Sequence, residues 1–82
     1  MAYSNAQKLQ SLGVATPLAL ELQAQITANV GNSRRLQELG YSPKLAAYVA
    51  TSITTGPMVA VTATRLGMDS VTAPIITAMV NA

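Results

Sequence analysis

Hydrophobic residues recur along this chain at the spacing of an α-helix. Aliphatic side chains stand every four positions in residues 18–30 and again in residues 45–53. Apolar residues three or four positions apart share one face of a helix. The pattern therefore predicts two long amphipathic helices. Leucines three positions apart at residues 9–12 and 36–39 predict a short helix before each of them.

A Leu–Gly pair follows each short helix and occurs three times. Gly13, Gly40 and Gly67 are 27 residues apart in both intervals. Each is followed by an alanine after six residues and a branched aliphatic residue after thirteen. Glycine ends helices well because it adopts the left-handed conformation without a Cβ clash. We therefore expect one all-α domain over residues 1–82, built from three tandem helix–Gly–helix units at about 4–30, 31–56 and 57–82 and packed as a small helical bundle or a short solenoid.

Small polar residues and prolines mark the expected helix starts. A hydroxyl at the N-cap accepts a free backbone N–H, and proline at the first helical position loses no hydrogen bond. The predicted caps of the first two units are Ser4, Thr16, Ser33 and Ser42.

The third unit departs from this pattern. A short helix is expected over residues 57–66, and Asp69 is expected to cap a last helix over residues 70–81. Because Pro74 would remove a hydrogen bond inside that last helix, we expect a bend or a later start there.

The apolar stripes of the three units should meet in one core, since no unit can bury its stripe alone. The residues expected to be mostly buried are Leu18, Leu22, Ile26, Leu39, Leu45, Val49, Ile53, Leu66 and Ile76.

The amino-acid composition excludes most kinds of metal-binding and catalytic site. The 82 residues include no Cys and no His, so a disulfide is excluded and a zinc, haem or copper site is nearly so. The three acids, Glu21, Glu38 and Asp69, are isolated in the sequence, and no glycine-rich phosphate loop is present. We therefore expect no enzyme activity, no cofactor and no small-molecule ligand.

Charge argues against a membrane or nucleic acid as the partner. Residues 45–64 carry no charge, but they contain six Ser or Thr residues and a central Gly–Pro pair. The first residues lack the charged and apolar regions of a secretory signal. A net charge of +2 is too small to favour nucleic acid. A helix-turn-helix reader needs several basic side chains on its recognition helix, and only Lys44 is available in the second long helix.

The apolar surplus instead indicates a protein partner. The chain is 50% hydrophobic and 10% charged, and six of its eight charges lie in residues 1–44. A water-exposed terminal repeat should be polar, so an apolar one indicates that another chain covers it. We expect a partner to contribute stability. The predicted partner interface, with a symmetry copy or a capsid protein, is Met58, Val61, Val71, Ile75 and Met79.

Arg34 and Arg35 form a possible secondary contact with an acidic or phosphate surface. Cations in the first turn of a helix are disfavoured by the helix dipole, which invites a functional interpretation. The simpler interpretation is that one arginine pairs with Glu38 and the other is solvated.

Residues 36–41, Leu–Gln–Glu–Leu–Gly–Tyr, resemble the short signature of peptidoglycan-binding modules. That family continues with a Gly- and Asp-rich loop, whereas Ser42–Pro43 leads straight into a helix here. A peptidoglycan- or nucleic-acid-binding helical module is the alternative function.

A wider resemblance covers about half the chain, in residues 12–19, 24–32 and 35–40. These segments resemble repeat segments of small tailed-bacteriophage virion proteins of the head-fibre or capsid-associated type. The resemblance implies a structural protein, expressed in the host cytoplasm and located in the virion. It implies binding to the major capsid protein or another virion subunit in many copies, as decoration, cement or fibre base. It implies no catalytic residues.

Overall fold

Helices and the turns between them make up residues 4–82, which are the residues that the structure describes. This computed structural model contains α1 (Asn5–Ser11), α2 (Thr16–Ala28), α3 (Ser33–Glu38), α4 (Pro43–Thr55), α5 (Ala60–Arg65) and α6 (Ala73–Asn81). No strand occurs between residues 4 and 82. The predicted all-α class and the small helical bundle are therefore confirmed.

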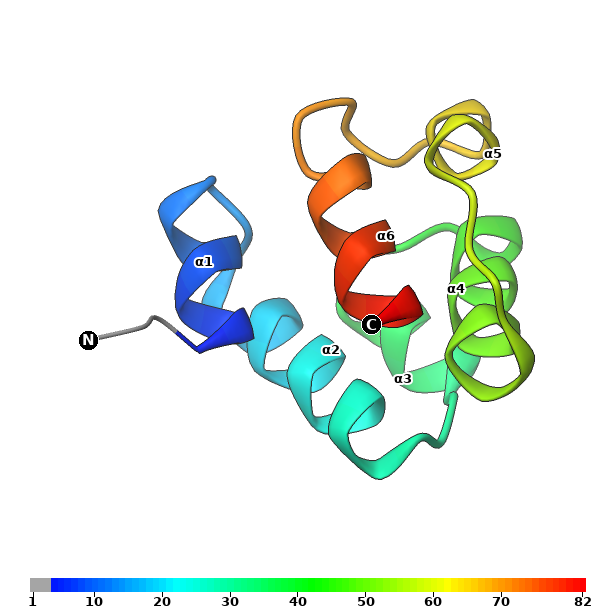
Figure 1. Ribbon diagram of the computed structural model, residues 1–82, viewed down its shortest axis with the longest axis horizontal. Coiled ribbons are helices and arrows are strands. Elements are labelled where there is room, and N and C mark those ends of the chain that lie inside the picture. Colours follow the sequence, from blue (N-terminus) through cyan, green and yellow to red (C-terminus); the bar gives the residue numbers. More distant parts are fainter. Residues whose placement is uncertain (1–3) are drawn as a thin grey trace.

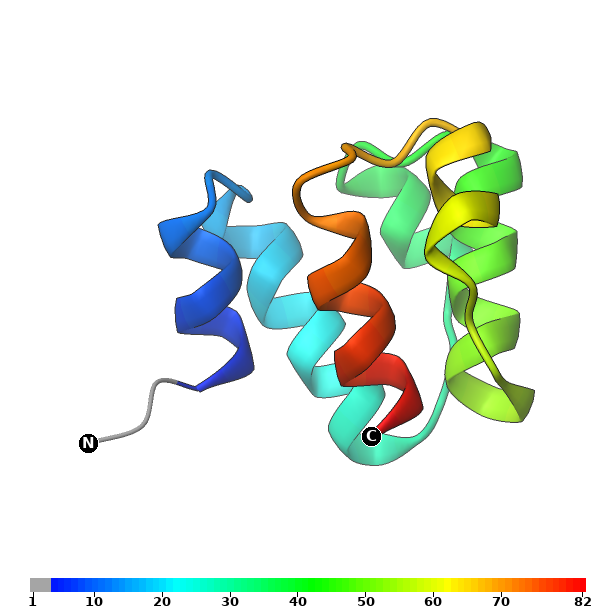
Figure 2. The same ribbon diagram turned by 45° about the horizontal axis from the view of Figure 1, so that its top comes forward.

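Consecutive helices pair into three hairpins. The pairs are α1 with α2, α3 with α4, and α5 with α6 (Figure 1). The turns of all three hairpins lie at the same end of the molecule, at the top of Figure 2. Helix α6 packs against both α1 and α4, so the third hairpin closes the bundle between the first two.

The same helix cap closes each hairpin turn. Gly13, Gly40 and Gly67 have φ angles of 96°, 120° and 114°, as predicted. In each turn the glycine N–H donates to the carbonyl three residues earlier, and the next N–H donates to the carbonyl five residues before it, at 3.0–3.1 Å. This is the Schellman motif, which satisfies carbonyl groups at a helix end. The residues that follow the three glycines are Val14, Tyr41 and Met68.

Two of the predicted N-caps are confirmed. The Ser4 hydroxyl accepts the N–H of Gln7 at 3.2 Å, and the Gln7 side chain accepts the N–H of Ser4 at 2.8 Å, which is a capping box. The Ser42 hydroxyl accepts the N–H of Leu45 at 3.3 Å, with Pro43 next to it.

The predictions of Thr16 and Ser33 as N-caps are wrong by one residue. Both are already helical, and the caps are Ala15 and Asn32. The Asn32 side chain accepts the N–H of Arg35 at 3.0 Å, so its amide oxygen takes the role expected of a serine hydroxyl. Ala15 offers no side-chain acceptor, and α2 begins without that bond.

Both helices of the third unit start later than predicted. Residues 56–59 are not helical, with a cis Gly56–Pro57 peptide bond, and α5 begins at Ala60. Helix α6 begins at Ala73 and holds Pro74 in its first turn, where the missing N–H costs no bond. This is the later start that the proline predicted. Asp69 accepts the N–H of Thr72 at 3.2 Å, so it caps the turn before α6 rather than the helix.

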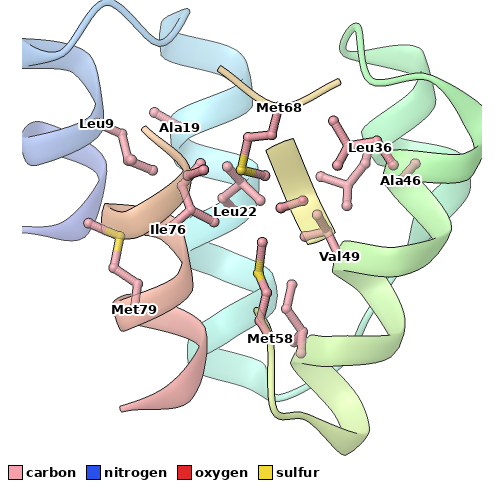
Figure 3. Packing of buried hydrophobic residues seen from close by; sticks show 14 of the residues in the cluster. Leu9, Ala19, Leu22, Leu36, Ala46, Val49, Met58, Met68, Ile76 and Met79 are labelled. Atoms are coloured by element: carbon pink, nitrogen blue, oxygen red, sulfur yellow. The ribbon is translucent and has the colours of Figure 1, made fainter. Parts of the chain in front are cut away.

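The core lies between the three hairpins (Figure 3). Its largest fully buried side chains are Leu9, Leu22, Leu36, Val49 and Ile76. Of the residues predicted to form the core, five are buried and four are partly buried. The buried ones are Leu22, Leu45, Val49, Ile53 and Ile76, and the partly buried ones are Leu18, Ile26, Leu39 and Leu66.

A side-chain amide holds each segment that joins two hairpins. The buried Gln25 amide accepts the N–H of Asn32 at 3.0 Å and donates to its carbonyl at 3.3 Å. The Asn81 amide accepts the N–H of Met58 at 2.7 Å and donates to its carbonyl at 2.8 Å. These segments lack helical hydrogen bonds, so the amides supply the partners that buried backbone groups require.

The first of these segments also packs closely on α4. The Gly31 N–H donates to the Thr54 hydroxyl at 3.1 Å. A Cβ atom at position 31 would lie 2.6 Å from the carbonyl carbon of Ala50, and nearer still to its oxygen. Glycine is required here because two backbones approach each other, and not because of its φ angle.

The chain exposes 4761 Å² of surface. A monomer of this mass is expected to expose about 4,700 Å². The fold therefore leaves about as much surface exposed as ordinary monomers of its size, and the expectation that a partner chain contributes stability stays a prediction.

Candidate functional site

Aliphatic side chains are exposed on the last hairpin. Val61 on α5 is 60% exposed, Val71 in the turn before α6 is 59% exposed, and Ile75 in the first turn of α6 is 37% exposed. We call these three residues the C-terminal apolar surface. With Val59, this region holds four of the seven large exposed hydrophobic residues of the described chain, so the apolar gradient of the sequence persists at the surface.

Met58 and Met79, the other two residues of the predicted interface, belong to the core instead. They are only 2% and 8% exposed; Figure 3 shows the Met58 side chain pointing into the interior and the Met79 side chain pointing toward α1. Met58 lies in the non-helical segment before α5, and it was predicted to lie in the interface from its apolar character alone. Met79 lies four residues from Ile75 and faces α1, where it is almost completely covered. A partner could therefore reach Val61, Val71 and Ile75, whereas the thioether of Met58 is buried and that of Met79 presents only a small edge to the groove described next.

A shallow groove of about 310 Å³ adjoins this surface between α1 and α6. Ile75, Ala78 and Met79 line one wall, and Asn5 and Lys8 line the other. The groove is mostly apolar, with one cation at its rim.

Arg34 and Arg35 differ in their surroundings. Arg35 Nε lies 3.5 Å from Glu21, and an Arg35 guanidinium nitrogen lies 3.2 Å from Glu38. The simpler interpretation, an arginine paired with Glu38, is therefore confirmed for Arg35. Its side chain is half exposed, so each pair stabilises the fold by no more than about 1 kcal/mol. Arg34 is exposed and takes part in neither of the two ion pairs found within residues 4–82.

The structure brings together one site that the sequence did not indicate. The three hairpin turns surround a cleft of about 310 Å³, which we call the turn cleft. Val14, Tyr41 and Met68, the equivalent residues after the three glycines, all line it. The remaining lining residues are Leu12, Gly13, Ala15, Leu18, Gly67, Asp69 and Thr72.

The lining of the turn cleft combines apolar walls with two polar groups. The Asp69 carboxylate is exposed, and one of its oxygens accepts the N–H of Thr72. Tyr41 is half-buried, and burial raises the pKa of its hydroxyl to about 12. The 27-residue spacing of the three Leu–Gly pairs was the sequence signal for this site, but the spacing could not show that the turns converge.

A third groove, of about 390 Å³, runs along α4 and is lined only by small and hydroxyl side chains and Gly31. It contains no charged group that could bind an ionic ligand or act in catalysis.

Within residues 4–82 no three acidic, His or Cys residues lie close enough together to hold a metal ion. Over the same residues, no helix has both the length and the apolar character needed to cross a membrane.

No protein-family model, curated protein or solved structure matches this chain. Its function therefore has to be argued from its own residues.

Proposed function

We propose that this chain is a structural virion protein of a tailed bacteriophage, and that it binds the capsid or another virion subunit through its last hairpin. The observation that carries the proposal is the C-terminal apolar surface. Val61, Val71 and Ile75 are exposed, and with Val59 they make up four of the seven large exposed hydrophobic residues of the described chain. The resemblance of residues 12–19, 24–32 and 35–40 to virion repeat segments supports the same role.

Burial of these side chains against a partner subunit would supply the free energy of binding. Apolar surface removed from water contributes about 25 cal/mol per Å², and aliphatic groups at the centre of an interface need no matching hydrogen bonds. Few charges surround them, since Arg65 and Asp69 are the only charged residues after Lys44. A partner surface would therefore lose little charge solvation on contact.

The chain has no set of residues suited to catalysis, and we propose that it is not an enzyme. It would act in many copies, as decoration, cement or fibre base. A subunit with this role needs a stable fold and a surface that binds its neighbours. The buried core and the C-terminal apolar surface support this proposal.

We further propose that the three hairpins are tandem 27-residue repeat units. The support is the Schellman cap, whose two hydrogen bonds recur at the same interval in all three turns. The Gln25–Asn32 amide contact joins the first unit to the second, whereas the Asn81–Met58 contact lies within the third unit. The shorter α6 reflects Pro74.

The test is incorporation into phage particles. Val71→Asp combined with Ile75→Asp should reduce the amount of this protein in gradient-purified particles by at least about tenfold, because buried charge is costly to desolvate. The matched control is Thr64→Asp combined with Ser70→Asp, which adds the same charge at exposed polar positions of the same hairpin. It should incorporate normally.

A second arm uses Arg34→Ala combined with Arg35→Ala. Normal incorporation of the Val71/Ile75 variant together with loss of the arginine variant would refute the proposal and move the interface to the N-terminal half. Circular dichroism of each purified variant separates loss of binding from loss of folding.

A further inference from the structure

The turn cleft has the composition of a binding site for a positively charged group. Asp69 is the one charged residue in its lining, and neither ion pair formed within residues 4–82 involves it. Only one of its two carboxylate oxygens accepts a hydrogen bond from residues 4–82, from the N–H of Thr72. A carboxylate can accept several hydrogen bonds, so Asp69 retains free acceptor positions at the cleft.

Tyr41 provides a second polar group in the cleft. Tyr41 lines the cleft and is half-buried there. A tyrosine hydroxyl is neutral at physiological pH, and burial raises its pKa here from 10.0 to about 12, so it adds no second negative charge. An aromatic ring also attracts cations to its face.

The other walls are apolar. Val14, Leu18 and Met68 line the cleft, and the side chain of Met68 reaches down into the core (Figure 3). A ligand that fits must therefore present a methylene chain to these walls and a single charge to Asp69. Long cationic side chains have this combination of an aliphatic stem and a charged end.

We propose that the turn cleft binds the side chain of a lysine or arginine presented by a partner protein. The ammonium or guanidinium group would meet the Asp69 carboxylate beside Tyr41, and the stem would lie against Leu18 and Val14. A protein side chain fits better than a free polyamine, because a polyamine carries several cations and the cleft offers one carboxylate. This inference goes beyond the proposed virion role, since it concerns a contact separate from the C-terminal apolar surface.

The experiment is a titration of the ¹⁵N-labelled full chain, followed by NMR. The probes are N-acetyl-arginine amide, N-acetyl-lysine amide and spermidine, with N-acetyl-citrulline amide as a neutral analogue of nearly the same shape as arginine. We expect saturable shifts of the amides of Gly13, Gly67 and Thr72 with the arginine or lysine probe, and none with citrulline. Tighter binding of spermidine than of both amino-acid probes would overturn the assignment to a protein side chain.

Two variants test the role of the carboxylate. Asp69→Asn keeps an oxygen that can accept the Thr72 N–H but removes the charge, and it should weaken binding of the arginine probe by at least about fivefold. Glu38→Gln removes an acid three residues from Tyr41 that does not line the cleft, and it should leave binding unchanged.

Equal shifts with citrulline and arginine, or equal loss of binding in both variants, would overturn the proposal. Should Asp69→Asn fail to fold, the difference between arginine and citrulline on the unaltered chain decides the question by itself. The outcome of the NMR titration does not affect the particle experiment on Val71 and Ile75. The proposed ligand of the turn cleft and the proposed virion interface can therefore be refuted independently.

Discussion

The close approach of Gly31 to α4 allows a prediction with a magnitude. In Gly31→Ala the new Cβ would lie 2.6 Å from the Ala50 carbonyl carbon and 2.8 Å from its Cα. Carbon atoms in contact are normally about 3.5–4.0 Å apart, so the segment must retreat by about 1 Å. Since both sides are backbone, no side-chain rotation can relieve the contact.

The retreat of the Gly31 segment from α4 would lower the free energy of unfolding in two ways. Overpacking of a rigid contact costs about 1–3 kcal/mol. The hydrogen bond from Gly31 to Thr54, 3.1 Å long, would also be stretched beyond use, which costs about 1 kcal/mol. We therefore expect Gly31→Ala to lower the free energy of unfolding by about 2–4 kcal/mol. Each kcal/mol lowers Tm by about 4–8 °C in a domain of this size.

Urea unfolding followed by circular dichroism measures the change. Thr54→Val is the matched control, since it removes the hydroxyl but keeps the shape, and it should cost only about 1 kcal/mol. A Gly31→Ala variant as stable as the unaltered chain, or more stable than Thr54→Val, would refute the steric reasoning.

Three further predictions concern other parts of the fold. Gly40→Val meets open space but must adopt a φ of 120°, so it should cost about 1–2 kcal/mol or more in urea unfolding. Leu45→Ala empties a site that is 3% exposed and should cost about 2–5 kcal/mol in the same assay; a loss below 1 kcal/mol would mean that the site is not a packed core position. The pKa of Tyr41 is raised from 10.0 to about 12, so the folded chain keeps this proton at a pH where the unfolded chain loses it. The free energy of unfolding should fall as pH rises from 10 to 12, and Tyr41→Phe should reduce that fall.

Local signals in the sequence predicted the hairpins. Glycine favours the end of a helix because it adopts the left-handed conformation readily, and this preference depends on that one residue rather than on distant contacts. Ser42–Pro43 likewise opens α4 through contacts within four residues. Prediction of Gly13 and Gly40 as helix ends therefore needed no knowledge of the tertiary packing.

The candidate sites depended on contacts that the sequence does not reveal. Met58 and Met79 were assigned to an interface because their apolar character was clear, but their direction was not. Asn81 helps to set that direction for Met58 by binding both of its backbone groups from 23 residues away. The turn cleft was missed for the same reason, since Tyr41 and Asp69 lie on different hairpins and meet only when the bundle closes.

The buried methionines of the third unit have a consequence for its chemistry. Met58, Met68 and Met79 all contribute thioethers to the core, whereas the first two units contribute only leucine, isoleucine, valine and alanine to the buried cluster of the described residues. Peroxide converts methionine to a polar sulfoxide, but it reaches a buried thioether only when the surrounding structure opens. A sulfoxide cannot return to the same apolar site without a large penalty. Opening of the α5–α6 hairpin in the presence of an oxidant would therefore increase the mass of the chain until a sulfoxide reductase reverses the oxidation, so the mass of the third unit would report its local unfolding.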